Sequence, residues 1–338
     1  AAATAAPDPT LNDVTTTALA NLTALQQQGG DGLITKDLTL SSEQRAAIDA
    51  AVADITAAGY QVSFTAVDMA TGGALSEGGD VMRYSASSIK APYIVALAQT
   101  GTIDLDKVAA GQAGDLTDLV TNTLTVSDND SYATLVHRYG TDPFVKWKDG
   151  VGMADGQVGD YGDLDTLDLA RMWTMTYDFL FADSPARGGT ASASARAWLA
   201  KQMVGSLNSS IDESNYGNDL TVYSKASWIN GDGGYYALND GGIVVPSGAS
   251  DLSDKPQGAV IAILSNACGR NDLLQPLAAA LRDAVGTVPT TTADTTDGTA
   301  ATTGGPTDGT AATTEGTTTE ATDGADDGQG AALAWSER

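Results

Sequence analysis

The spacing of apolar residues predicts a helix followed by strands at the start of a compact domain. Ser41 and Gln44 have the spacing of a helix capping box, in which side chains satisfy the first backbone amides of the helix. Apolar residues then recur at helical intervals as far as Gly59. Over 60–66 apolar residues alternate with polar or smaller ones, and a turn leads to a short strand near 74–75. The predicted order is therefore a helix and then a β-hairpin.

Strands return near the end of this region, after a long helical stretch. Residues 88–207 have mainly helical patterning. Strands are predicted at 223–228, 243–245 and 259–264, and a last helix at 271–285. Strands at both ends with helices between them indicate an α+β fold with one antiparallel five-stranded sheet flanked by the terminal helices. The middle helices would form an inserted all-helical lobe, with a cleft between it and the sheet.

Composition divides the chain into three parts. We predict a leader segment over 1–40, a folded domain over 41–286 and a tail over 287–338. The tail consists mainly of Thr, Gly, Ala and Asp and contains the sequence TDGTAATT twice. So few apolar residues cannot offset the entropy lost on ordering, so we expect a disordered, solvated spacer or cell-wall stalk.

The charge balance excludes several kinds of partner. The chain has 17 basic and 43 acidic residues, a net charge of −26 and a pI near 4.1. Such an acidic chain is a poor candidate for binding nucleic acid or anionic lipid. No apolar run approaches the roughly 18 residues of a membrane span. The first residues lack the basic and apolar regions of a signal peptide, and we expect them to remain from one already removed, which predicts an extracytoplasmic protein.

Histidine and cysteine are too scarce for most metal and nucleophile chemistry. His137 and Cys268 are single residues of their kinds, so multi-histidine and cysteine-rich metal sites are excluded. A Ser-His-Asp triad would require His137 as its base, and we expect that residue to be structural or on the surface. We expect Cys268 to be semi-buried, and we expect neither a metal nor another cofactor.

Three short motifs carry the candidate chemistry. Of the eight lysines, only Lys90 has a serine, Ser87, three positions earlier. On a helix these two side chains share a face, where a neutral amine can take the proton of a hydroxyl. Ser127-Asp128-Asn129 and Lys225-Ala226-Ser227 follow in the chain. Each motif alone also fits ordinary helix capping or solvation, but the ordered set favours catalysis.

This set resembles the motifs of class A β-lactamases and penicillin-binding serine hydrolases, over about residues 42–286. The resemblance implies acyl transfer to Ser87, with β-lactams or D-amino-acid peptides of the cell wall as substrates, no cofactor, and a monomeric protein. It implies catalytic roles for Ser87, Lys90, Ser127 and Lys225, and substrate binding by Asn129, Ser227 and Trp228. Ser127 would pass a proton to the leaving group, and the N–H groups of Ser87 and Trp228 would hold the oxyanion.

Two departures from the family pattern point to slow turnover. Ala226 lacks the hydroxyl that normally binds the substrate carboxylate, which Ser227 would partly replace. Residues 152–168 contain no Glu to activate the deacylating water, and Asp160 and Asp163 are the candidate replacements. The alternative is a non-catalytic module that binds peptidoglycan or a partner protein, which acylation by a reactive lactam would distinguish. A structural cell-surface role is supported only by the tail.

Overall fold

The structure is a computed structural model that describes residues 13–150, 153, 161–181, 189–215, 217–247 and 257–286. The predicted tail over 287–338 and the candidate Asp160 lie outside these residues. No helix among the described residues is long and apolar enough to cross a membrane.

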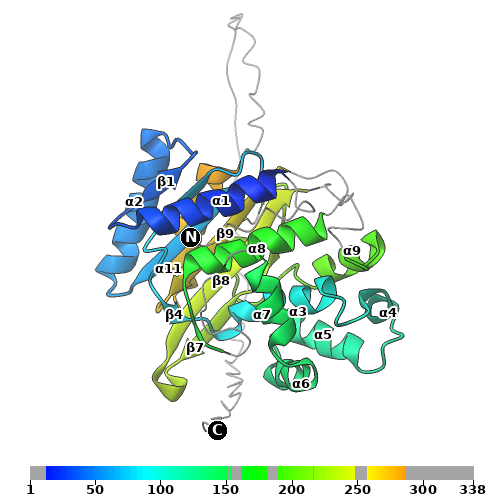
Figure 1. Ribbon diagram of the computed structural model, residues 1–338. Helices are drawn as coiled ribbons and strands as arrows, with labels where there is room; N and C mark the ends of the chain where they lie inside the picture. The colour runs from blue at the N-terminus through cyan, green and yellow to red at the C-terminus, as the bar shows by residue number, and fades with distance from the viewer. Residues whose placement is uncertain are drawn as a thin grey trace, which may run out of the picture. The chain divides into compact units, whose positions relative to one another are not determined.

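An antiparallel sheet forms the centre of the described chain (Figure 1). Its order is β1 (Ile34–Lys36), β3 (Ala74–Glu77), β2 (Val62–Asp68), β9 (Ala259–Ser265), β8 (Tyr236–Pro246) and β6 (Leu220–Ser224), and β7 (Ser227–Asn230) also pairs with β8. A separate two-stranded sheet joins β4 (Arg83–Tyr84) to β5 (Asp163–Leu164).

The sheet has seven strands rather than the five predicted. One of the additional strands, β1, is only three residues long and pairs only with β3 among the described strands. The other comes from an interruption, since Ser224 lies opposite Gly242 in β6 and Ser227 lies opposite Asn239 in β7. Both segments keep one register with β8, so they are two parts of the single strand predicted at 223–228.

Helices cover both faces of the sheet, and the remaining helices form a lobe beside it (Figure 1). On one face α2 and α11 pack together, and on the other lies α8 with α1 against it. The bounds of the helices are α1 Asp13–Gln28, α2 Ser42–Ala57, α3 Lys90–Gln99, α4 Leu105–Ala109, α5 Leu116–Thr125, α6 Asn129–Tyr139, α7 Asp142–Asp149, α8 Thr166–Leu180, α9 Ala193–Lys201, α10 Ser210–Glu213 and α11 Asn271–Val285.

The close packing of α8 on the sheet depends on a glycine. All fifteen residues of α8 are buried, and Trp173 lies directly over Gly241 in β8. A Cβ atom at Gly241 would be 2.1 Å from Nε1 of Trp173, so only glycine fits there. This contact holds α8 against the strand that pairs with the third motif.

The helix α1 lies in the predicted leader, outside the predicted domain 41–286, and yet it packs into the core of that domain. Leu22 and Leu25 are 0% and 1% exposed, within the same cluster as α8. The Thr15 hydroxyl donates to Asp178 of α8 at 3.0 Å. The packed region therefore extends at least to Asp13, because the apolar face of α1 is buried by a helix that is distant in sequence.

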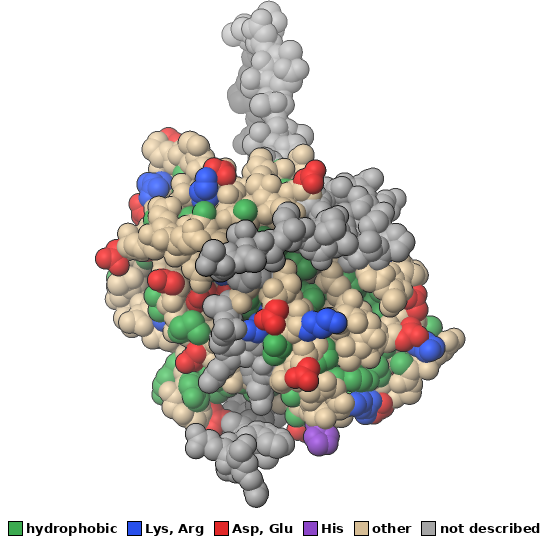
Figure 2. Space-filling model, in the orientation of Figure 1, with side chains coloured by type: hydrophobic (Ala, Val, Ile, Leu, Met, Phe, Trp, Pro, Cys, Tyr) green, Lys and Arg blue, Asp and Glu red, His purple; other side chains and the backbone are tan. Residues whose placement is uncertain are grey.

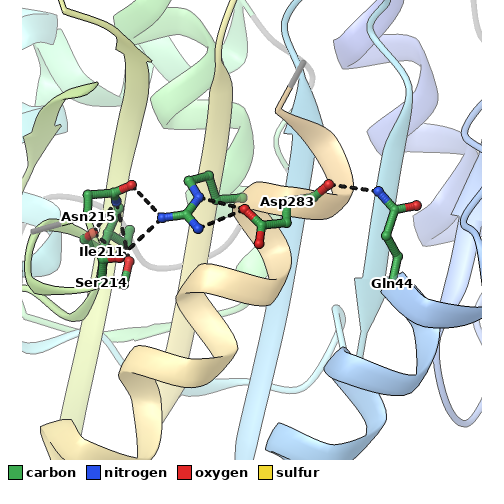
Figure 3. A network of polar contacts seen from close by, with 6 residues as sticks. Gln44, Ile211, Ser214, Asn215 and Asp283 are labelled. Carbon is green, nitrogen blue, oxygen red and sulfur yellow. Dashed lines mark hydrogen bonds and ion pairs between the residues drawn. The ribbon is translucent and has the colours of Figure 1, made fainter. Parts of the chain in front are cut away.

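The predicted capping box at the start of α2 is present and also connects to α11. The Ser41 hydroxyl accepts from the Gln44 amide, and the Gln44 side chain accepts from the Ser41 amide. Figure 3 shows the Gln44 side chain reaching Asp283 near the end of α11, where it donates to the backbone oxygen at 2.7 Å. On the other side of α11, Arg282 donates to Asn215 at 2.7 Å, so this helix is tied to both of its neighbours.

Candidate active site

The candidate nucleophile Ser87 lies in a short 3-10 turn that leads into α3. This turn, η1, spans Ala86–Ile89, and the Lys90 amide donates to the Ser87 carbonyl at its end. In a 3-10 turn residues i and i+3 eclipse one another, so Ser87 and Lys90 emerge on the same side. Helical structure therefore begins near Ser87, as predicted, but as a 3-10 turn, and the α-helix itself begins at Lys90.

Ser87 is the accessible serine of the pair Ser87-Ser88. Ser87 is half-buried, whereas Ser88 is fully buried and donates its hydroxyl to the Ser85 carbonyl at 2.7 Å. The preceding Ala86 has a φ of 42°, a left-handed conformation that is strained for a residue with a Cβ atom. The backbone is thus bent sharply just before the Ser87 hydroxyl.

The Lys90 amine is held by the second motif. Its Nζ donates to the Ser127 carbonyl at 2.6 Å and to Oδ1 of Asn129 at 2.7 Å, with a longer contact of 3.3 Å to the Asp128 carbonyl. Within the described residues the Ser87 hydroxyl has no hydrogen-bond partner, so the predicted Ser87–Lys90 contact is not formed in this arrangement.

Burial makes Lys90 a candidate base. The side chain is 0% exposed, and burial, together with the nearby positive charge of Lys225, lowers the pKa of Lys90 to about 7. A neutral amine has two N–H bonds and one lone pair. The two short contacts of Nζ account for both N–H bonds, which leaves the lone pair for the hydroxyl proton.

Two tyrosine rings complete the surroundings of Lys90. The Nζ atom lies 5.5 Å from the ring centroid of Tyr132 and 5.7 Å from that of Tyr161. The Tyr161 hydroxyl also donates to Oδ1 of Asn129 at 2.9 Å. Oδ1 of Asn129, an exposed residue, thus receives donors from both Lys90 and Tyr161.

The second motif forms the entry to α6. Ser127 has a φ of 58°, a strained conformation that aims its carbonyl at Lys90. The Asp128 carboxylate accepts from the Ser131 amide at 2.7 Å. Hydrogen bonding with the Ser131 side chain, and then with this amide, lowers the pKa of Asp128. Asp128 therefore acts as the N-cap of α6.

The third motif occupies the break between β6 and β7. Lys225 is 1% exposed and donates to the Ala226 carbonyl at 2.5 Å. Burial lowers the pKa of Lys225, and burial raises that of Asp240 on the neighbouring strand β8. The two charges favour each other, so each partly offsets the cost of burying the other.

The strand register determines which way the Trp228 amide points. Lys225 N–H donates to Gly241 O, and Gly231 N–H donates to Tyr235 O, so odd-numbered residues of this strand bond to β8. In an antiparallel pair the intervening residues point their N–H groups away from the partner strand. Ala226 N–H does so and donates to the Ser206 hydroxyl at 3.0 Å. The Trp228 N–H therefore faces away from β8, along the edge against which η1 packs.

Ser227 does not take the place predicted for it. The residue is 0% exposed, and its hydroxyl donates to the Ser85 carbonyl at 3.1 Å. Asn239 of β8 donates to the same carbonyl at 3.1 Å. The Ser227 hydroxyl thus holds β7 against the turn before Ser87, and it is not free to bind a substrate carboxylate.

Comparison with known proteins identifies the family and the fold. The sequence model described as "Beta-lactamase enzyme family" matches residues 44–253, more than half of the chain. The chain belongs to the beta-lactamase enzyme family. No curated protein matches its sequence.

Solved structures share the fold at low sequence identity. A β-lactamase from Sphaerobacter thermophilus is 18% identical with a TM-score of 0.55, over 72% of this chain and 98% of that one. A β-lactamase from Desulfarculus baarsii is 17% identical with a TM-score of 0.52, over 72% and 98%. The protein PBP-A is 16% identical with a TM-score of 0.53, over 73% and 98%. The α+β fold with a helical lobe is that of these enzymes.

The remaining candidates lie outside the three motifs themselves. Asp163 is exposed in β5, opposite Tyr84, and Asp160 is outside the described residues. His137 is exposed near the end of α6, as predicted. Cys268 is partly buried, also as predicted, and burial raises its pKa.

Sequence reasoning missed the tyrosines around Lys90. Tyr132 follows the second motif by one turn of α6, which is a signal that helical spacing could have provided. Tyr161 precedes β5 and reaches Asn129 from a segment 32 residues further along the chain. Nothing in the local sequence predicts that contact.

Proposed function

We propose that this member of the beta-lactamase enzyme family is an exported serine hydrolase that acts by Ser–Lys acyl transfer, with slow release of the acyl group. Lys90 carries the proposal, because a buried amine with a pKa of about 7 lies one turn from an accessible serine. Such an amine can accept a proton at neutral pH. We include export in the proposal because the proposed cell-wall substrates lie outside the cytoplasm.

In the proposed reaction Ser87 Oγ attacks a carbonyl carbon while Lys90 takes the hydroxyl proton. The Ser87 and Trp228 N–H groups stabilise the oxyanion, and Ser127 passes a proton to the leaving group. Lys225 keeps the region around Ser127 positive. The substrates are β-lactams or D-amino-acid peptides, and one PBP-A structure is titled as an acyl-enzyme complex with penicillin G.

Slow acyl release is proposed because residues 152–168 contain no Glu. In the described part of 152–168, Asp163 is exposed in β5, and Asp165 caps α8 by accepting from the Asp168 amide at 2.7 Å. Burial raises the pKa of Asp165 to about 6, but its hydrogen bond commits it to the helix end. Asp160 and Asp163 therefore remain the candidate water activators.

The test is an intact-mass time course of the protein with excess penicillin and, separately, with a thioester acyl donor. We expect a persistent adduct on the native protein and none on Ser87→Ala with either reagent. An adduct that also forms on Ser87→Ala would overturn the assignment of the nucleophile.

A second candidate is a non-catalytic module that binds peptidoglycan or a partner protein in the same cleft. The inward hydroxyl of Ser227 favours it, because the third motif then offers no side-chain hydroxyl to a substrate. The absence of any adduct from both reagents, with retained binding of cell-wall fragments, would establish this candidate instead.

A further inference from the structure

Exposed apolar side chains gather beside the candidate site. The described residues include eight large hydrophobic side chains that are exposed. Six of them lie close in sequence to one of the three motifs, to β4, or to the hairpin formed by β7 and β8. Figure 2 shows hydrophobic side chains over the hairpin end, at the lower left. The six are Val81, Met82, Val126, Trp228, Tyr235 and Tyr236.

The aromatic members are held in place by the fold. Trp228, Tyr235 and Tyr236, here called the aromatic rim, belong to β7, β8 and the turn between them. The Tyr235 ring stacks on Tyr84 with centroids 4.2 Å apart and an interplanar angle of 23°. Tyr84 in β4 lies three residues before Ser87, so the stack fixes Tyr235 and the turn of the hairpin relative to the candidate nucleophile.

The rim begins at the residue whose amide faces the reacting carbonyl. Trp228 is 38% exposed, and its N–H points away from β8 toward the edge beside η1. A substrate carbonyl bound between the Ser87 and Trp228 amides would therefore place an adjacent group against an exposed indole. Burying apolar substrate surface there is favourable.

The cations of the motifs and of β4 are all engaged within the protein. Lys90 and Lys225 are 0% and 1% exposed and donate to protein oxygens. Arg83 in β4 donates to Ser63 at 3.1 Å and to Gln61 at 3.3 Å. Among the described residues of η1, β4, β5, β7 and β8, no other lysine or arginine is present.

Acidic groups flank the rim instead. Asp163 lies opposite Tyr84 in the small sheet and is exposed. Asp232 lies in the turn of the hairpin, where its carbonyl accepts from the Tyr235 amide. A carboxylate on the substrate would meet these negative charges, and the described residues of η1, β4, β5, β7 and β8 offer no uncommitted lysine or arginine to pair with it, which is unfavourable.

The third motif offers no alternative anchor for a carboxylate. Ala226 is 0% exposed and has no hydroxyl, and the Ser227 hydroxyl is turned toward the Ser85 carbonyl. The exposed side chain that follows them is Trp228. The surface next to the reacting carbonyl is thus apolar where a carboxylate-binding site would require a donor or a cation.

We propose that the leaving-group side of the substrate is uncharged and apolar, and that it lies on the aromatic rim. The substrate is then an ester, a thioester or an amide without a free carboxylate next to the scissile bond, and penicillin, which has such a carboxylate, is a slower acyl donor than a neutral thioester. This inference rests on the proposed function. In the step itself a Ser87 Oγ–carbon bond forms and the bond from carbon to the leaving atom breaks. The hydroxyl proton passes through Lys90 and then Ser127 to the leaving atom, and water later releases the acyl group.

The test compares two thioesters with the same N-acyl-D-alanyl group. One has mercaptoacetamide as its leaving group and the other has mercaptoacetate, so the pair differs only in the charge next to the scissile bond. A thiol reagent reports release of the leaving group, and kcat/KM is measured for both with the full chain. We expect the neutral thioester to be favoured by at least about tenfold.

Variants of Trp228 test whether the rim causes the preference. Trp228→Ala should reduce kcat/KM for the neutral thioester by about tenfold and change the anionic one little, while Trp228→Phe should retain most of the preference. Trp228→Arg adds a cation, keeps the backbone N–H, and should shift the ratio toward the anionic thioester. Because Trp228 is partly exposed, these variants should fold, which thermal melting checks.

The outcomes separate the two proposals. Thiol release from both thioesters that depends on Ser87, with equal or greater kcat/KM for the anionic one, would overturn the inference and leave the proposed hydrolase intact. A neutral preference that Trp228→Ala and Trp228→Arg leave unchanged would also overturn the assignment to the rim. No Ser87-dependent release from either thioester would overturn both.

Discussion

The buried amine of Lys90 makes the pH dependence of acylation a quantitative test. Its pKa is lowered from 10.5 to about 7, first by burial and then by Lys225. At pH 7 roughly half of the Lys90 side chains would be neutral, against roughly one in 3,000 for an ordinary lysine. Burial therefore raises the population of the neutral base by roughly a thousandfold.

The direction of the pH profile follows from which form is active. A lowered pKa means that the neutral amine predominates above about pH 7, and protonation below it removes the base. The acylation rate of Ser87 by the neutral thioester should fall about tenfold per unit below pH 7 and reach a plateau above it. Single-turnover measurements from pH 5 to about pH 9 at constant ionic strength would record this profile.

Two substitutions isolate the cause. Lys90→Arg keeps the positive charge but cannot provide a neutral amine, so acylation should fall by about 10²–10⁴-fold. Lys107→Arg is the matched control, because Lys107 is exposed and pairs with Asp104 on the surface. Lys225→Met removes the neighbouring like charge and should move the midpoint of the profile to higher pH.

The reasoning would be refuted by an acylation rate that is constant between pH 5 and about pH 9. It would equally be refuted by a Lys90→Arg protein that acylates within about tenfold of the native rate. If the midpoint of the pH profile lies near the usual pKa of a lysine, burial does not lower the pKa of the base that activates Ser87.

Four further substitutions test other parts of the structure. Tyr161→Phe removes a donor to the amide of the second motif and should slow acylation about fivefold, near 1 kcal/mol, without lowering the melting temperature; an unchanged rate would remove Tyr161 from the site. Leu22→Ala should lower the free energy of unfolding by about 2–5 kcal/mol in denaturant titration, because this side chain is fully buried; a loss below about 1 kcal/mol would place α1 outside the core. Gln44→Ala should lower the free energy of unfolding by about 1 kcal/mol in the same assay. The control Gln27→Ala, at an exposed position, should change it hardly at all. Equal losses in the two variants would contradict the stabilising role of the helix cap. Ser227→Ala should lower the free energy of unfolding by about 1 kcal/mol and leave KM for the neutral thioester unchanged. A raised KM with unchanged stability would show instead that the Ser227 hydroxyl binds the substrate.

The sequence was most informative where the chemistry depends on local spacing. Ser87 and Lys90 lie one turn apart because the chain between them is helical, and the Ser41–Gln44 capping box is likewise a contact within one turn. The main strands alternate over enough residues to be recognised. The three residues of β1 are too few for such a pattern.

The parts that the sequence could not predict depend on contacts between distant segments. The polar positions of α1 look solvated in isolation, but Thr15 meets Asp178, 163 residues away. The Ser227 hydroxyl is directed by the Ser85 carbonyl, 142 residues away, and so a residue of suitable chemistry faces the wrong side. Only the register of β7 on β8 decides that orientation.

The most direct measurement locates the acyl group after reaction with the neutral thioester. The protein would be quenched in acid during turnover, digested, and sequenced by tandem mass spectrometry. The account predicts a single acyl ester on Ser87, absent from Lys90→Arg on the same timescale. An acyl group on Ser127 or Lys225, or none on any residue while thiol is released, would contradict it.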